Sequence, residues 1–174
     1  MDEFTGIINR LRSKATLHLN MGCGDALISG AINCDFRGGN QVIKMDITNP
    51  SVNDFGDVCL IESHHAIEHL PMNVVEPTLE RWYAALKVGG HLIITCPDLE
   101  LVVQKWLDSD RAFGNYEMKM LFGSQEHDGM YHKCGFTKRI MIDMLTRIGF
   151  RIHITASPWP KRPTPSLLVI AEKL

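Results

Sequence analysis

The feature that most constrains the fold of this chain is a strand-like segment that runs into a Gly-Cys-Gly loop. Residues 16–20 alternate apolar and polar side chains, and Gly22, Cys23 and Gly24 come after a single residue. Glycine permits a sharp turn and a close backbone approach to a ligand because it has no Cβ. Alone, Gly-x-Gly is a weak signal, since any tight turn after a strand can look the same. Its meaning therefore depends on the residues further along the chain.

Strand-like and helix-like segments alternate over the rest of the sequence. Apolar or alternating runs predict strands at residues 16–20, 31–35, 41–46, 57–62, 91–96, 151–157 and 167–171. Helical periodicity predicts helices at residues 3–14, 73–87, most of 99–123 and around 141–148. Gly89-Gly90 is expected to stop the helix at 73–87. This alternation predicts an open, mostly parallel sheet with helices on both faces.

Length and composition favour a single domain and exclude several classes of function. The chain has 174 residues, of which 45% are hydrophobic, which suits one core. A net charge of −2 provides no electrostatic footprint for nucleic acid or an acidic membrane. No apolar run approaches the ~20 residues that span a bilayer, and the acidic start lacks a signal core. The five cysteines contain no Cys-x-x-Cys pair, which indicates a reduced, cytoplasmic protein with inert buried thiols.

Two acids stand at the carboxyl ends of the second and third predicted strands, where ligands of open α/β sheets bind. Asp35 can accept both hydroxyls of a ribose, and Asp46 can accept an exocyclic adenine amine, with Ile47 against the ring. A dinucleotide fold requires a third glycine where this chain has Leu27, and no phosphate-binding P-loop is present. The pattern therefore points to an adenosyl ligand. The short spacing from Gly22 to Asp35 predicts a first crossover helix that is short or replaced by a loop.

Eight short motifs succeed one another in a recognisable order over residues 15–172. They are Leu17–Gly24, Gly30–Asp35, Asp46–Thr48, Ile67–Pro71, Leu86–Gly90, Pro97–Glu100, His132–Thr137 and Ile148–Phe150. Together they resemble class I S-adenosylmethionine-dependent methyltransferases, in particular the small type 11-like predicted methyltransferases. The resemblance implies a Rossmann-like, doubly wound α/β fold of three layers (α/β/α). Its sheet would have seven mostly parallel strands and an antiparallel last strand.

The same resemblance implies S-adenosylmethionine as cofactor and S-adenosylhomocysteine as product. No residue is expected to bind a metal. It places the cofactor against the glycine loop, the two strand-ending acids and the residues after the fourth strand. The expected cofactor-binding residues are Asn20, Met21, Gly22, Cys23, Gly24, Asp35, Phe36, Asp46, Ile47, Ser63 and His64. A single domain is expected over residues 1–174, with a lid-like insertion at about 99–135. Asn20 departs from the family, because an acid often stands at that position.

The segment Glu62–His69 holds three histidines and two glutamates, which makes it the densest group of potential catalytic side chains in the sequence. Methyl transfer to a hydroxyl needs alignment and a base that works near neutral pH, and histidine suits that task. The candidate bases are His65 and His69, with His132 from the insertion. The expected acceptor is a small molecule or a sugar rather than nucleic acid or a membrane component. The oligomeric state is left open.

Two other functions remain open from the sequence. His65-x-x-Glu68-His69 matches the pattern of inverted zinc metallopeptidases, in which two histidines one helical turn apart bind one zinc ion. The departure at Asn20 leaves room for a protein that binds S-adenosylmethionine without catalysis. Asp98 also has two interpretations, because it can orient a histidine or substrate, or cap the helix that begins near Leu99.

Overall fold

The computed structural model describes residues 3–50, 57–127, 129–156 and 165–174, which form one seven-stranded sheet in the order β3-β2-β1-β4-β5-β7-β6. The strands are β1 (His18–Met21), β2 (Ile32–Asp35), β3 (Val42–Lys44), β4 (Val58–His64), β5 (Leu86–Pro97), β6 (Phe150–Ala156) and β7 (Ser166–Lys173). β7 runs antiparallel to both of its neighbours, and the other strand pairs are parallel. The predicted sheet, including its antiparallel last strand, is confirmed.

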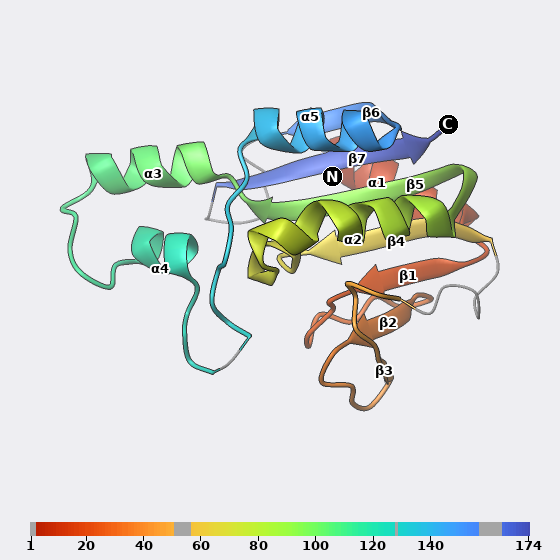
Figure 1. Cartoon of the computed structure of the whole chain (residues 1–174), viewed down its shortest axis with the longest axis horizontal. Coiled ribbons are helices and arrows are strands. Elements are labelled where there is room, and N and C mark those ends of the chain that lie inside the picture. Colours follow the sequence, from red (N-terminus) through yellow and green to blue (C-terminus); the bar gives the residue numbers. More distant parts are fainter. Residues whose placement is uncertain (1–2, 51–56, 128, 157–164) are drawn as a thin grey trace.

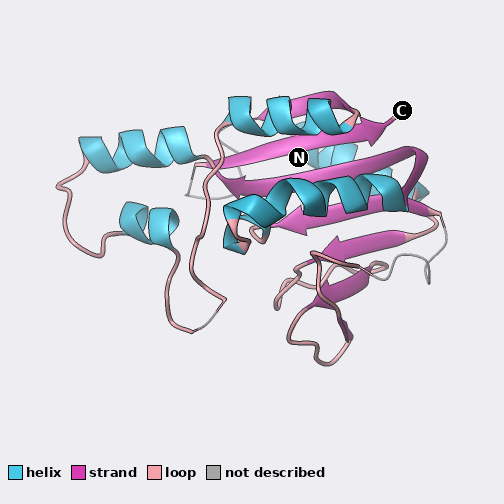
Figure 2. Cartoon of the chain, viewed as in Figure 1, coloured by secondary structure: helices cyan, strands magenta, loops and turns pink. Residues whose placement is uncertain are grey.

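Helices cover both faces of this sheet (Figure 1). The helical elements are α1 (Glu3–Lys14), the short 3₁₀ helix η2 (Ile67–His69), α2 (Met72–Ala85), α3 (Leu99–Asp108), α4 (Tyr116–Phe122) and α5 (Lys138–Ile148). α2 and α5 lie on one face and α1 on the other, while α3 and α4 extend beyond the end of β5 (Figure 1). The connection between α4 and α5 is largely loop (Figure 2). The predicted three layers are therefore present.

The central strands supply both halves of the core because successive side chains of a strand point to opposite faces. In β5, Leu92 and Ile94 belong to the larger apolar cluster with α2 and α5. Ile93, between them, belongs to the smaller cluster with Ile8 of α1. This double burial explains why the strand reads as a continuous apolar run.

One predicted boundary is wrong. The helix expected to stop at Gly89-Gly90 ends at Ala85, and β5 begins at Leu86, which pairs with Val58. The pairing register then shifts across an irregularity, which places Gly90 where the backbone is crowded. A Cβ at Gly90 would lie 2.8 Å from the carbonyl oxygen of Lys87 and 3.1 Å from that of Val58. Close strand packing, not a helix terminus, accounts for this glycine.

The crossover from β1 to β2 contains no helix, which confirms the predicted compact loop. Two asparagines on neighbouring strands, Asn20 of β1 and Asn33 of β2, hold this loop through hydrogen bonds. The side-chain amide of Asn20 donates to Asn33 Oδ1 over 2.8 Å and to the carbonyl oxygen of Ala26 over 3.0 Å. The backbone N–H of Ile28 also donates to Asn33 Oδ1, over 2.9 Å. Asn20 therefore stabilises the loop, which is a structural reason for an amide at this position.

The cysteines carry no disulfide, and no helix within the described ranges is long and apolar enough to cross a membrane. Burial raises the pKa of Cys34 to about 11, and burial together with the Glu68 carboxylate raises the pKa of Cys134 to about 11. Both match the expected inert thiols. Cys59 differs: burial acts to raise its pKa, but hydrogen bonds involving Thr16, Leu17 and Lys87 outweigh burial and lower the pKa to about 7.

Candidate functional site

A cavity of about 600 Å³ opens at the carboxyl ends of β1, β2 and β4, where the sheet order changes direction. Ligands of doubly wound sheets bind at this position. Eight of the expected cofactor-binding residues line it: Gly22, Cys23, Gly24, Asp35, Phe36, Asp46, Ile47 and His64. Segments far apart in sequence thus meet at one edge of the sheet.

The glycine loop is held by its own backbone. The N–H groups of Gly22 and Cys23 donate to the carbonyl oxygen of Cys34 over 2.8 and 3.0 Å. Gly22 has a φ of 70°, and a Cβ there would lie 2.6 Å from the Cβ of Ala66. Glycine is required at this position because the loop after β4 approaches so closely. Gly22 and Ala66 both line the cavity.

Asp35 ends β2 and faces the cavity, but much of its carboxylate is already engaged. Oδ2 accepts a hydrogen bond from the backbone N–H of Gly24 over 3.0 Å. Oδ1 accepts from the backbone N–H and from Nε of Arg37, over 3.0 and 3.3 Å. Each carboxylate oxygen offers about two acceptor positions. One position on Oδ2 therefore remains for a ligand, and a second opens on Oδ1 when the Arg37 side chain moves away.

Helix α2 holds the segment after β3 in place. Trp82 Nε1 donates to the carbonyl oxygen of Ile47 over 2.9 Å, and Arg81 donates to that of Thr48 over 3.0 Å. Asp46 Oδ1 accepts from the backbone N–H and the hydroxyl of Thr48, over 2.9 and 2.7 Å. These bonds leave Asp46 Oδ2 at the cavity as an acceptor, beside the apolar side chain of Ile47.

Three expected cofactor-binding residues lie beneath the cavity rather than along it. Asn20, Met21 and Ser63 are buried in the central strands and do not line the cavity that the described residues form. Asn20 uses its amide to brace the β1–β2 loop. Met21 belongs to the larger apolar cluster. Strand residues next to a binding loop share its sequence motif but alternate in direction, so only some of them reach a ligand.

The end of β4 carries a buried carboxylate that is fully paired. Glu62 is 0% exposed and receives two 2.7 Å hydrogen bonds from Arg12 of α1. Its oxygens also lie 3.0 Å from His18 Nε2 and 2.8 Å from His64 Nε2. Burial would raise the pKa of the Glu62 carboxyl, but the hydrogen bonds from Arg12, His18 and His64 hold it well below its ordinary range. His64 Nδ1 lies 3.0 Å from Thr95 Oγ1, so both of its ring nitrogens are engaged.

His65 does not occupy a helix, which corrects one sequence expectation. Its φ is 53°, and it forms the turn between β4 and the short helix η2. Its Nε2 lies 3.2 Å from the hydroxyl of Ser166, and its Nδ1 lies 3.4 Å from Glu68 Oε1. His65 and His69 are therefore not one turn apart on a helix. The geometry required by the metallopeptidase pattern is absent from this segment.

The far wall of the cavity comes from the α4–α5 segment, residues 123–137. Four residues of this segment line the cavity together with Gly129: Glu126, His127, Met130 and Lys133. Gly123 pairs with Tyr131 in an antiparallel bridge that closes the loop between them. A Cβ at Gly129 would lie 3.3 Å from the Phe36 ring, which packs against this backbone. These residues lie within the lid-like insertion expected at about 99–135, but no sequence signal singled them out individually.

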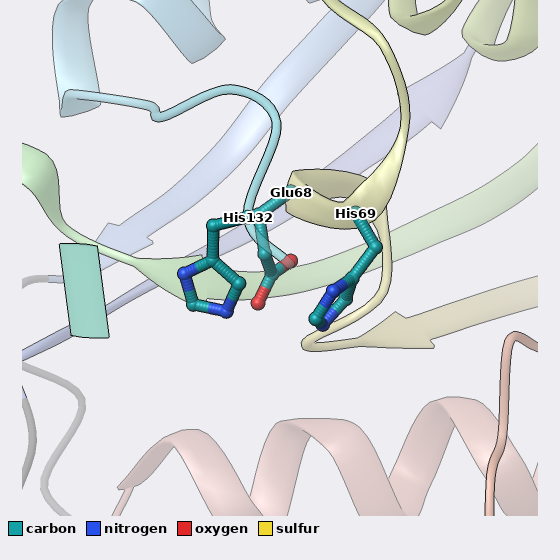
Figure 3. A group of neighbouring side chains, drawn as sticks. All are labelled: Glu68, His69 and His132. Atoms are coloured by element: carbon teal, nitrogen blue, oxygen red, sulfur yellow. The ribbon is translucent and has the colours of Figure 1, made fainter. Parts of the chain in front are cut away.

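The remaining predicted histidines meet at one side of the cavity (Figure 3). His69 lines the cavity, whereas His132 lies next to it, at the base of the α4–α5 segment. Their rings meet edge to face with centroids 4.8 Å apart. The carboxylate of Glu68 lies between them (Figure 3), and each of the three residues brings a ligand atom within 4.8 Å of the other two. Burial lowers the pKa of His132, although the Glu68 carboxylate acts in the opposite direction.

Asp98 caps a helix. Its side chain accepts hydrogen bonds from the backbone N–H groups of Glu100 and Leu101 at the start of α3. This geometry confirms the capping interpretation of this acid.

Comparison with known proteins identifies the fold. No family model matches the sequence, and no curated protein resembles it significantly. An S-adenosylmethionine-dependent methyltransferase from Methanosarcina mazei superposes over all of this chain and 99% of its own, with a TM-score of 0.66 and 16% identity. The chain has the fold of class I S-adenosylmethionine-dependent methyltransferases.

Two further structures show how widely the acceptors of this fold vary. One is the Burkholderia thailandensis 1,6-didemethyltoxoflavin-N1-methyltransferase, solved with its acceptor and S-adenosylhomocysteine. It covers 97% of this chain and 76% of its own, with a TM-score of 0.64 and 14% identity. The other is the small RNA methyltransferase HEN1, which covers 97% of this chain but only 24% of its own, with a TM-score of 0.65 and 14% identity. The fold therefore leaves the acceptor open.

Proposed function

We propose that this chain is an S-adenosylmethionine-dependent methyltransferase that acts on a hydroxyl group of a small molecule or a sugar. The observation that carries the proposal is the cavity at the switch point, where Gly22–Gly24, Asp35 and Asp46 converge. The solved relative from Burkholderia thailandensis binds S-adenosylhomocysteine, which supports the same cofactor here.

The residues of the cavity fit an adenosyl ligand. Asp35 Oδ2 has an acceptor position for one ribose hydroxyl, and release of Arg37 Nε would provide one for the second. Asp46 Oδ2 would accept from an adenine amine, and Ile47 would lie against the ring. Gly22–Gly24 would face the methionine part. When bound, S-adenosylmethionine supplies a methyl group activated by its sulfonium.

The acceptor end would lie between the turn after β4 and the α4–α5 segment. His65 and His69 line that side and stay the predicted groups beside the acceptor hydroxyl. Because the α4–α5 segment forms a wall of the cavity, we interpret it as part of a lid that excludes water during transfer. A partly apolar cavity of this size on a chain of net charge −2 favours a small acceptor over a nucleic acid.

A binding experiment tests the cofactor site. Asp35→Asn should weaken S-adenosylhomocysteine binding by about 1–3 kcal/mol in calorimetry, because a charge-assisted hydrogen bond is lost. Asp25→Asn is the matched control, since Asp25 also lines the cavity but its side chain is fully exposed to solvent. Equal affinities of the Asp35→Asn variant and the unmodified chain would contradict the ribose assignment.

A second experiment tests turnover. Mass spectrometry of the purified chain should find retained S-adenosylmethionine or S-adenosylhomocysteine, because the cavity is walled on several sides. Labelled methyl groups should then transfer to hydroxyl-bearing small molecules rather than to amines or RNA. Tight cofactor binding without transfer to any acceptor would favour the alternative of a non-catalytic S-adenosylmethionine-binding protein.

A further inference from the structure

Glu68 is a buried carboxylate whose charge is not compensated by hydrogen bonds. It is 1% exposed, and both of its carboxylate oxygens are buried without a hydrogen-bond partner among the described residues. His65 Nδ1 lies 3.4 Å from Oε1, which is too long for a good hydrogen bond. Buried carboxylates are normally paired, hydrogen-bonded or bound to a metal ion. Glu68 is therefore a candidate to bind a cation.

The two neighbouring histidines are oriented as metal ligands are. His132 Nδ1 lies 2.8 Å from the carbonyl oxygen of Met120, and His69 Nδ1 lies 3.1 Å from that of Tyr131. A carbonyl oxygen has no proton to give, so each Nδ1 must be the donor. In the neutral rings, Nε2 then carries the lone pair that can bind a metal. A hydrogen bond of this kind, from Nδ1–H to a backbone carbonyl, is the usual arrangement for metal-binding histidines.

The backbone holds the three residues in this arrangement. The N–H groups of Lys133 and Cys134 donate to the carbonyl oxygen of Glu68 over 2.8 and 3.3 Å. The N–H of His132 donates to the carbonyl oxygen of Phe122 over 3.1 Å. These bonds join η2, α4 and the α4–α5 segment at one point. The positions of the three residues are therefore fixed by backbone hydrogen bonds at a junction of three elements.

We propose that Glu68, His69 and His132 bind a divalent first-row transition-metal ion at the base of the α4–α5 segment. Two imidazoles and one carboxylate suit zinc, cobalt, iron or manganese better than magnesium or calcium, which prefer an all-oxygen shell. Metal–ligand bonds of about 2.1 Å bring ligand atoms to about 3.4 Å from one another. The present spacing is up to 4.8 Å, so binding of an ion would draw the three ligand atoms closer together.

This metal site differs from the one suggested by His65-x-x-Glu68-His69. His132, 63 residues beyond His69 in sequence, takes the place of His65 as a ligand. His65 instead points its Nε2 at Ser166 and its Nδ1 at Glu68, where it can steady the carboxylate. The pattern thus indicated one of the three proposed ligands, His69, but in a local geometry that the chain does not adopt.

The role of the site in catalysis deepens the proposed function and rests on it, whereas metal binding itself does not. Three protein ligands leave coordination positions open, and His69 also lines the cofactor cavity, so an acceptor hydroxyl can reach the ion. A coordinated hydroxyl loses its proton more readily, and that proton passes to solvent. The oxygen then forms a bond to the methyl carbon while the carbon–sulfur bond breaks, and its electron pair stays on sulfur.

Cobalt binding tests the site directly. The whole chain, first treated with a chelator, is titrated with Co²⁺ and followed by calorimetry and visible absorption. We expect one equivalent to bind and to give the d–d bands of a cobalt–imidazole site. His132→Ala should raise the Kd at least about 100-fold. Glu68→Gln keeps the side-chain shape and should have the same effect, so a folding defect in the alanine variant does not decide the outcome.

The chain provides a matched control in a second group of possible ligands, His91, His153 and Glu172. There the carboxylate is already paired, with His153 at 2.7 Å and Arg151 at 3.4 Å. His153→Ala should leave the cobalt affinity unchanged. Absence of stoichiometric cobalt binding to the unmodified chain would overturn the proposal. So would undiminished binding to both site variants, or an equal loss in His153→Ala.

Cofactor binding separates this inference from the proposed function. S-adenosylhomocysteine affinity is measured in excess chelator, where the cavity residues are intact. If S-adenosylhomocysteine binds and Co²⁺ does not, the metal site is wrong and the proposed function stands. If Co²⁺ binds as expected and S-adenosylhomocysteine does not, the metal site stands and the methyltransferase proposal fails.

Discussion

Two buried glutamates, Glu62 in β4 and Glu68 in η2, differ in how their charges are compensated. Glu62 is surrounded by Arg12, His18 and His64, all within 3.0 Å of its oxygens. Glu68 has histidines nearby but no hydrogen bond to either oxygen within the described part of the chain. A buried charge is tolerated only when it is paired or bound to a metal. The difference indicates that Glu62 stabilises the fold, and it supports our proposal that Glu68 binds a ligand.

The comparison predicts its largest effect at Glu62. Glu62→Gln should lower the free energy of unfolding by about 3 kcal/mol, because removal of one partner leaves the others buried without their counter-charge. Part of the Arg12 side chain is exposed and can be solvated, which keeps the loss from being larger. Urea unfolding at neutral pH measures this difference. A loss below about 1 kcal/mol would show that the cluster around Glu62 does not stabilise the fold.

The next largest effect is expected from acid, because protonation of Glu62 should remove its contribution to the free energy of unfolding. The folded pKa of Glu62 lies below its unfolded value of about 4.3. Its contribution is therefore present above about pH 4.3 and is lost as the pH falls toward the folded pKa. The stability gap between the unmodified chain and Glu62→Gln should narrow between pH 5 and pH 3 in urea unfolding. A gap that stays constant over this range would contradict the pairing.

Glu68→Gln should have a much smaller effect on the metal-free chain, a change of less than about 1 kcal/mol in either direction. The amide has nearly the same shape as the carboxylate and removes a charge that no hydrogen bond compensates. Urea unfolding in excess chelator measures the change. A loss as large as that of Glu62→Gln would mean that Glu68 is paired in solution, and the contrast between the two glutamates would disappear.

The smallest effect is expected at the exposed ion pair of His153 and Glu172. Hydrogen bonding to His153 lowers the pKa of Glu172, but both side chains are partly exposed to solvent. His153→Ala should change the free energy of unfolding by less than about 0.5 kcal/mol, as is common for surface pairs. A thermal or urea melt at low salt checks this value. A larger loss would show that exposure is a poor guide to which carboxylates of this chain matter.

Much of the fold could be predicted because its causes are local. The period of apolar side chains determines which segments are strands and helices, and the order of those segments limits the sheet to few topologies. The helix expected at residues 3–14 has the observed bounds of α1. The helix expected to end at Gly89-Gly90 has a different end, because strand pairing of Leu86 with Val58 overrides local propensity.

The side of the cavity proposed to bind the cofactor could also be predicted from sequence, since the glycine loop, Asp35 and Asp46 each end or come after a strand. Parallel strands bring such residues to one edge. The orientation of individual side chains was harder to predict. Asn20, Met21 and Ser63 belong to the same segments, yet their side chains are buried and do not line the cavity. The pairing of Arg37 with Asp35 was missed. The lid expected at about 99–135 was too broad to single out the residues that line the cavity, because loops carry no periodic signal.

The sequence by itself determined which segments are strands and helices and which acids end strands at one edge of the sheet, because these result from periodicity and chain order. Only the tertiary structure decided which buried glutamate is paired. Arg12 lies 50 residues from Glu62, and His132 lies 64 residues from Glu68. The partner of a buried charge depends on which elements pack together around it, and no local pattern encodes that choice.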